Sequence, residues 1–156
     1  MTEAIKCYRL VIPLIIEMYM RVMVFGTFDN LHPGHLNYFK QARQFGEEMI
    51  IIVARDKNVL RIKGRLPQEN EKIRVRKIKA SLRESGDKGR VILGGLTNQW
   101  LVLKKYRPAV IALGYDQQVD LKRLKSEIVK FRLFCKIKRL KPYRPEKYKS
   151  SYCREK

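Results

Sequence analysis

The sequence is poor in the residues that cross-link small proteins or bind metals. Only three cysteines and two histidines occur in 156 residues, and Cys7, Cys135 and Cys153 do not have the two-residue spacing of a zinc knuckle. This odd and sparse set argues against a disulfide scaffold and indicates unpaired thiols in a reducing, cytoplasmic compartment. Cys135 and Cys153 flank the C-terminal region, and the sequence leaves their role open.

Long hydrophobic runs are also missing. The longest, residues 10–16, is interrupted by Pro13 and is far shorter than the ~20 residues that span a bilayer. We therefore expect no membrane-spanning segment, and no small-residue cleavage site follows the run as it would in a signal peptide. Residues 1–19 are interpreted as an N-terminal extension, with a short helix packed on the domain as the alternative. Residues 20–156 are interpreted as a single domain that includes a basic C-terminal segment, 138–156.

Acidic residues are few relative to basic ones. Fifteen Asp and Glu stand against 35 Lys and Arg, giving a formal net charge of +20, and residues 121–156 alone contain 14 Lys and Arg but 3 Glu. This balance predicts polyanionic partners: nucleic acid, an anionic membrane or phosphate-rich small molecules. Charge alone does not choose among them. The 45% hydrophobic content is enough for one core, and the length suits one domain.

Apolar runs and helical spacing alternate along the chain. Buried strands are predicted at 22–26, 49–54, 91–93, 109–113 and 133–137, and helices at about 33–46, 70–82, 97–106 and 120–130. Residues 55–65 are interpreted as a charged, basic loop. The alternation predicts an α/β fold, a Rossmann-like open parallel sheet with helices on both faces. Ligands of such sheets bind at the carboxyl ends of the strands.

The ten residues 26–35, GTFDNLHPGH, combine the end of a strand, a turn, two histidines and the start of a helix. Free backbone N–H groups at a helix start attract anions, and Gly34 leaves room for a ligand. His32 and His35 are expected on one side of the first turn, as donors to phosphate. An isolated His-x-x-His is more often a surface pair or a metal site, but no third ligand has an obvious place beside this one.

Gly26–Asp29 with His32–His35 resembles the signature of the cytidylyltransferase-like nucleotidyltransferases, and the resemblance covers about residues 20–156. Two further stretches resemble the archaeal-type FAD synthases: Val53–Val59 with Arg61–Arg65, and Leu113–Gln117. The resemblance implies an FMN adenylyltransferase of the nucleotidyltransferase (HIGH-type) fold, which converts ATP and FMN into FAD and pyrophosphate. It also implies Mg²⁺ or another divalent cation with ATP, and by analogy a homodimer.

The resemblance also implies roles for individual residues. His32 and His35 would stabilise charge on the α-phosphate, and Lys63 would reach the phosphates from the far side, which makes these three the catalytic set. The implied nucleotide-binding residues are Gly26, Thr27, Phe28, Gly34, Gly114, Tyr115, Asp116, Gln117, Ser150 and Ser151. No protein metal ligand is expected.

From spacing alone, several of these residues have plainer interpretations. Lys63 reads as a solvated loop charge, Asp116 as a cap or turn residue, and Arg74 as a solvated helix residue. Trp100 and the tyrosines Tyr106, Tyr143 and Tyr148 are expected to pack in the core or on the surface. Two alternative functions stay open: a cytidylyltransferase acting on glycerol 3-phosphate or a similar phospho-alcohol, and a basic nucleic-acid-binding protein on the same scaffold. Weak nucleic-acid binding by the enzyme is not excluded either.

Overall fold

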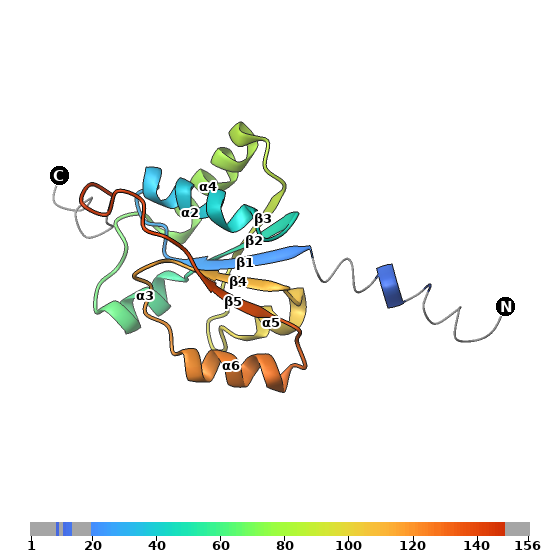
Figure 1. Cartoon of the computed structure of the whole chain (residues 1–156). Coiled ribbons are helices and arrows are strands. Elements are labelled where there is room, and N and C mark those ends of the chain that lie inside the picture. Colours follow the sequence, from blue (N-terminus) through green and yellow to red (C-terminus); the bar gives the residue numbers. More distant parts are fainter. Residues whose placement is uncertain (1–8, 10, 14–19, 149–156) are drawn as a thin grey trace.

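The computed structural model describes residues 9, 11–13 and 20–148, and its centre is one sheet of five parallel strands (Figure 1). The spatial order is β3-β2-β1-β4-β5. The strands are β1 (Arg21–Gly26), β2 (Glu48–Val53), β3 (Gly89–Leu93), β4 (Val110–Leu113) and β5 (Lys136–Arg139). The predicted α/β fold is confirmed.

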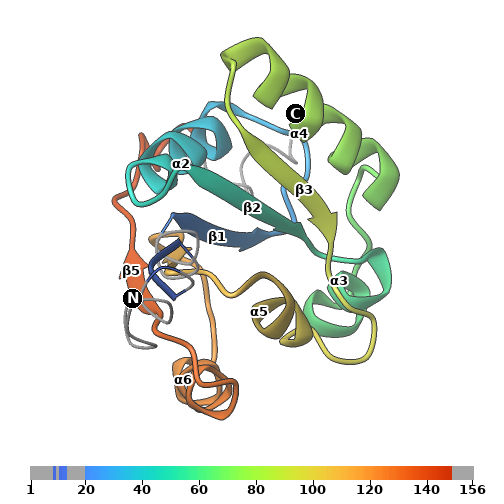
Figure 2. The same cartoon turned by 90° about the vertical axis from the view of Figure 1, so that its right-hand side faces the viewer.

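Helices cover both faces of this sheet (Figure 2). They are α2 (Pro33–Arg43), α3 (Asp56–Lys63), α4 (Glu71–Ser85), α5 (Leu101–Tyr106) and α6 (Leu121–Lys130). Helices α2 and α4 pack on one face, α5 and α6 pack on the other, and α3 lies beyond the carboxyl ends of the strands (Figure 1). Within the described ranges, no helix is long and apolar enough to cross a bilayer.

The two hydrophobic cores follow from the period-two alternation of strand side chains. In β1, Val22 and Val24 face the core under α2 and α4, whereas Met23 faces the core under α5 and α6. Both faces of the central strands are thus buried, which explains the uninterrupted apolar run in β2. Full burial of each such side chain contributes about 1.5–3 kcal/mol to folding.

Two predicted boundaries are wrong by several residues. Helix α5 begins at Leu101 rather than near 97, because Asn98 accepts a hydrogen bond from the Trp100 N–H and closes a turn ahead of the helix. Strand β5 begins at Lys136, and Leu133 is instead a buried loop residue of the core under α6. The predicted cap of α6 is confirmed, since the Asp120 carboxylate accepts from the Arg123 N–H at 2.9 Å.

The interpretation of residues 55–65 as a loop is wrong. Residues 56–63 form α3, which ends at Gly64 in the left-handed conformation (φ 71°), a common helix stop. Only Val59 of this helix is buried. With so little of α3 in the core, its sequence has no long apolar stripe to reveal the helix.

Candidate active site

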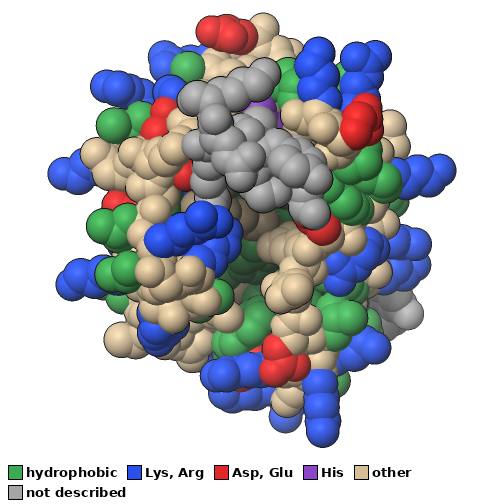
Figure 3. Space-filling view, turned by 90° about the vertical axis from the view of Figure 1, so that its left-hand side faces the viewer, with side chains coloured by type: hydrophobic (Ala, Val, Ile, Leu, Met, Phe, Trp, Pro, Cys, Tyr) green, Lys and Arg blue, Asp and Glu red, His purple; other side chains and the backbone are tan. Residues whose placement is uncertain are grey.

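An open cleft of about 780 Å³ lies at the carboxyl ends of the strands. Helix α2 leaves β1 toward one face of the sheet, and α6 follows β4 on the other face, so the cleft opens where these two neighbouring strands part. Figure 3 shows this end of the molecule hollowed, with apolar side chains inside and Lys and Arg side chains around the rim. The predicted site residues that the structure describes all line the cleft: Gly26, Thr27, Phe28, His32, Gly34, His35, Lys63, Gly114, Tyr115, Asp116 and Gln117.

The two histidines form a stacked pair at the start of α2. Their ring centroids are 3.8 Å apart with an interplanar angle of 21°. His32 is the N-cap, and its Nδ1 accepts a hydrogen bond from the Gly34 N–H at 3.1 Å, which places the ring proton on Nε2. His32 Nε2 and His35 Nδ1 are buried and have no hydrogen-bond partner among the described residues.

The expectation of free backbone N–H groups at this helix start is wrong. The Gly34 N–H is bound by His32 Nδ1, and the N–H groups of His35 and Leu36 both donate to the His32 carbonyl oxygen, at 2.9 and 3.2 Å. The backbone donors are therefore occupied by the capping turn. The unpaired polar atoms here belong to the histidine rings.

Both histidines are held neutral. Burial, the neighbouring His32 ring and the Lys63 ammonium together lower the pKa of His35 to about 3. Burial also lowers the pKa of His32. Near neutral pH the pair can therefore offer a ligand hydrogen bonds but no positive charge.

Phe28 packs against the ring of His35. It is buried, has a φ of 54°, and its ring meets the His35 ring edge-on at 5.5 Å. A Cβ at Gly26 would lie 2.6 Å from this ring, so only glycine lets Phe28 fold back beneath the end of β1. A bulky residue at positive φ is strained, and such strain is concentrated at functional sites.

Lys63 reaches the motif from the last residue of α3. Its Nζ donates to the Thr27 hydroxyl at 3.1 Å. The two residues are 36 positions apart in the sequence, and α3 with the following loop brings them together. The Lys63 side chain is therefore directed toward the GTFD turn, which the interpretation as a solvated loop charge does not account for.

Arg74 lies beneath the cleft, and its predicted solvated environment is wrong. Its side chain is fully buried rather than solvated. It donates to the carbonyl oxygens of Thr27, Ala54 (2.8 Å) and Glu69 (3.0 Å), and to the Asp56 carboxylate at 2.6 Å. Arg74 thereby ties the turn after β1 to the end of β2 and to the start of α3.

A signal for this burial exists in the sequence. Arg74, Ile78 and Leu82 follow one another at four-residue spacing, and all three are buried on the same face of α4. An arginine that continues an apolar stripe is a candidate for a buried, fully hydrogen-bonded group.

Asp29 holds the segment that joins α3 to α4. Its buried carboxylate accepts hydrogen bonds from the N–H groups of Gln68 and Glu69, both at 2.9 Å. Asp29 thus anchors the segment that follows Lys63 directly onto the GTFD turn. The motif position was noticed in the sequence, but this anchoring depends on residues 39 and 40 positions away.

The loop after β4 is braced from two sides. Gln117 accepts from the Gly114 N–H and donates to the Phe25 carbonyl, both at 3.1 Å, so its amide links β4 to β1. Arg139, from the end of β5, donates to the carbonyl oxygens of Gly114 (2.7 Å) and Gln117 (2.9 Å). The side chain of Gln117 is therefore occupied in shaping the loop. Asp116 lies in the turn of this loop, as its plainer interpretation predicts, and it also lines the cleft.

Two tyrosines extend the histidine stack. The Tyr148 ring lies parallel to that of His32, at 6.2 Å and 16°, and Tyr143 stacks on Tyr148 at 6.0 Å and 8°. The Tyr148 carbonyl oxygen lies 3.0 Å from where a Cβ on Gly34 would be. Both tyrosines line the cleft, so they form part of its wall rather than packing on the outer surface. Ser150 and Ser151 lie outside the described residues.

No group of three or more His, Cys, Asp or Glu side chains suited to a metal ion occurs in the part of the chain that the structure describes. Cys135 is a free thiol, and burial raises its pKa to about 12, which keeps it protonated. Cys7 and Cys153 lie outside the described residues.

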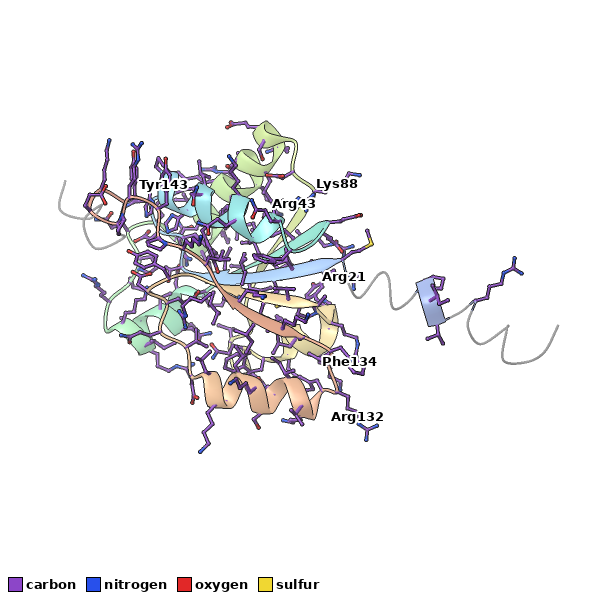
Figure 4. The ribbon with its side chains drawn as sticks, in the orientation of Figure 1. Arg21, Arg43, Lys88, Arg132, Phe134 and Tyr143 are labelled. Atoms are coloured by element: carbon purple, nitrogen blue, oxygen red, sulfur yellow. The ribbon has the colours of Figure 1, made fainter. Side chains whose placement is uncertain are left out.

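Basic side chains are not confined to the cleft. Figure 4 shows Tyr143 at the end of the sheet where the cleft opens, while Arg21, Lys88 and Arg132 lie toward the opposite end. The positive charge is therefore spread over the molecule rather than gathered at one binding face.

Comparison with known proteins identifies the family. The family model described as cytidylyltransferase-like matches residues 23–156. This chain belongs to the cytidylyltransferase-like family. Among its relatives, a protein named FAD synthase from Aciduliprofundum boonei is 40% identical over 124 residues, which is 80% of each chain. Another of that name, from Archaeoglobus profundus, is 37% identical over 132 residues, covering 85% of this chain and 81% of the relative.

Solved structures agree on the fold of this cytidylyltransferase-like chain. A lipopolysaccharide core biosynthesis protein from Thermoplasma volcanium superposes with a TM-score of 0.69 at 36% identity, covering 80% of this chain and 98% of that one. A pantoate-beta-alanine ligase from Francisella tularensis, complexed with beta-gamma ATP and beta-alanine, has a TM-score of 0.55 at 14% identity, over 96% of this chain and 73% of that one. The second likeness concerns the fold alone. The family predicted from the GTFD and HPGH stretches is confirmed.

Proposed function

We propose that this nucleotidyltransferase is an FAD synthase, which transfers AMP from ATP to FMN and releases pyrophosphate. The observation that carries the proposal is the convergence of the stacked His32–His35 pair and the Lys63–Thr27 contact in one cleft where β1 and β4 part. The name of its relatives, FAD synthase, agrees with this chemistry.

The reaction needs positioning more than acid–base catalysis. An oxygen of the FMN phosphate attacks the α-phosphorus of ATP, a new P–O bond forms, and the bond to pyrophosphate breaks with its electron pair leaving on oxygen. A phosphate monoester has a second pKa of about 6, so the nucleophile is already anionic near neutral pH. The chain's task is to align the groups and to stabilise the developing charge.

The residues of the cleft divide this task. His32 presents its Nε2 proton to a phosphate oxygen, and neutral His35 offers a second ring nitrogen beside it. Lys63 supplies positive charge at Thr27. The brace of Gln117 and Arg139 fixes the loop 114–117 for the adenosine, and Gly34, which has no side chain, leaves the room in which the His32 ring packs against the helix start. Ser150 and Ser151 are proposed to contact the β- and γ-phosphates.

A divalent cation fits this site only as a companion of the nucleotide. The described residues provide no protein cage, which suits Mg²⁺, a metal commonly held by substrate phosphates and water. Bound in this way, it would neutralise phosphate charge. A single catalytic domain over residues 20–156, an extension over 1–19, a homodimer and a cytoplasmic location stay predictions.

A product assay tests the function. Purified protein is incubated with Mg²⁺ and FMN plus ATP, FMN plus CTP, or glycerol 3-phosphate plus CTP, and the products are separated by chromatography. We expect FAD in the first mixture alone. CDP-glycerol in the third would assign the cytidylyltransferase reaction instead, and no product in any mixture would contradict the proposal.

A matched pair of variants ties the product to this site. His35→Asn keeps a polar side chain but removes the imidazole, and we expect turnover to fall at least ~100-fold, as when a preorganised charge-stabilising donor is lost. Lys40→Ala, exposed on the same helix, is the control and should retain full turnover.

A further inference from the structure

The cleft has a second wall that none of the predicted site residues except Lys63 occupies. It is formed by α3 and by the segment between β3 and α5. Arg55, the N-cap of α3, lines the cleft together with Asn58, Val59, Ile62 and Lys63 of the helix itself. The segment after β3 adds Gly94, Gly95, Gln99 and Trp100.

We propose that this wall, formed by Ile62 with Val59, Gly94 and Trp100, binds the flavin ring of FMN. This inference rests on the proposed function, since it names the acceptor's place within the same cleft. Three observations carry it: the position of the wall relative to the reacting groups, the chemistry of its surface, and an exposed isoleucine that the fold does not need.

The position follows from the order of the strands. The histidines and Thr27 follow the central strand β1, the loop 114–117 follows β4 on one side, and the wall follows β2 and β3 on the other. If the nucleoside lies at the β4 side, the β2–β3 side is left for the acceptor. In-line attack also requires the acceptor to approach opposite the leaving pyrophosphate, which we place beside the His32 and His35 rings at the start of α2. Helix α3 of the wall lies on the other side of the sheet's carboxyl end from that helix start (Figure 1).

The surface chemistry suits a flat, mostly apolar ring. The residues of this wall include no Asp or Glu, but they do include Arg55, Asn58 and Gln99. The Arg55 and Asn58 side chains are already hydrogen-bonded to Glu71 and to the carbonyl oxygens of Gly94 and Gly95, which leaves the apolar groups to meet the ring. Trp100 lines the cleft while most of its side chain is buried in the core under α5 and α6, so the part that reaches the cleft is held in place. Gly94 has no side chain, and a Cβ there would make only ordinary contacts, 3.4 Å from Ile52 Cγ2. The fold therefore does not require glycine at this position, whereas a bulky ligand benefits from the space.

Ile62 is the clearest sign. Its side chain is 68% exposed, yet it lines the cleft and immediately precedes Lys63. An exposed isoleucine has little to contribute to folding, but it can bury apolar surface against a bound ring. A sugar or glycerol phosphate would gain nothing from this contact.

The test compares two exposed apolar residues of the same segment. Ile62→Ser removes the proposed contact. Leu66→Ser is the matched control, because Leu66 is 60% exposed, lies four residues further on and does not line the cleft. FMN affinity is measured without ATP by quenching of flavin fluorescence, ATP affinity by calorimetry, and FAD formation by chromatography.

We expect Ile62→Ser to weaken FMN binding and to raise the KM for FMN about tenfold, the loss of one apolar contact. ATP affinity and Tm should be unchanged. Leu66→Ser should behave as wild type, and Gly94→Ala should shift FMN affinity in the same direction as Ile62→Ser.

The failure of this inference is distinguishable from failure of the proposed function. If the wild-type protein makes FAD but Ile62→Ser and Leu66→Ser bind FMN equally well, the flavin ring lies elsewhere and the proposed flavin site is wrong. An Ile62→Ser variant that weakens ATP binding as much as FMN binding also overturns it. If the wild-type protein neither binds FMN nor makes FAD, the function itself fails and the flavin site fails with it.

Discussion

Lys63 donates a hydrogen bond from its ammonium group to the Thr27 hydroxyl at 3.1 Å. This contact joins the end of α3 to the turn after β1, the two elements between which we propose that the phosphates react. It also brings the Lys63 charge close enough to His35 to help lower that histidine's pKa. Lys63 thus supplies charge to the site and adds to the larger effects of burial and of the His32 ring, which lower the pKa of His35.

Replacing Lys63 tests whether its own charge matters for the reaction or only the overall positive charge of this segment. We expect Lys63→Met to lower kcat/KM at least ~100-fold, because a preorganised charge at the transferring phosphate is lost. Arg65→Met, two residues further on and exposed outside the cleft, should change kcat/KM by less than about twofold. Steady-state kinetics with both substrates varied provides the measurement. Equal losses in the two variants would mean that only the overall positive field matters.

Replacing Arg74 is expected to lower the stability of the fold. Arg74→Met leaves the Asp56 carboxylate and the carbonyl oxygens of Thr27 and Ala54 without their donor, and the free energy of unfolding should fall by about 3–5 kcal/mol. Urea unfolding measures it. Arg76→Met, exposed on the same helix, is the control and should stay within ~0.5 kcal/mol of wild type. A loss as small as that of Arg76→Met would show that water can replace the Arg74 contacts.

The sequence predicts the parts of this molecule that depend on local pattern. The strands at 22–26 and 49–54 are predictable because both their faces are buried, which makes their sequences continuously apolar. The start of α6 is predictable because its cap, Asp120, contacts a residue only three positions away. Likewise, the GTFD and HPGH stretches place both histidines correctly at the start of α2.

Contacts between distant residues escape the same analysis. Asp29 holds residues 68 and 69, and Arg74 holds the Thr27 carbonyl, 47 positions away, so neither role has a local signature. Helix α3 has no clear sequence signal for a related reason: it buries only Val59, and contacts at its two ends hold it in position.

Gly34 tests how tightly the histidine pair is packed. A Cβ at this position would lie 2.9 Å from the His32 ring and 3.0 Å from the Tyr148 carbonyl oxygen, so Gly34→Ala must displace one of them. Because alanine favours a helix over glycine by about 0.5–1 kcal/mol, stability should change little. We expect kcat to fall about tenfold or more while Tm shifts by only a few degrees. A parallel loss of both would indicate unfolding rather than displacement.

The lowered pKa of His35 predicts how stability depends on pH. In the folded chain the pKa is about 3, whereas in the unfolded chain it is near the ordinary 6.5. Between these values the unfolded state binds the proton and the folded state does not, so protonation favours unfolding. The stability contributed by neutral His35 is therefore fully present above about pH 6.5 and is lost progressively as the pH falls toward 3.

His35→Asn isolates this effect, because asparagine does not titrate. The free energy of unfolding, measured in urea at pH 7.5, 5.5 and 4.5, should fall more steeply with acidification in wild type than in the variant. Carboxylates titrate in both proteins, so the difference between the two curves reports His35, and that difference should shrink steadily from pH 6.5 downward. A constant difference across this range would mean that His35 is as easily protonated in the folded state as in the unfolded one, and that its ring is not shielded by the Phe28 and His32 rings.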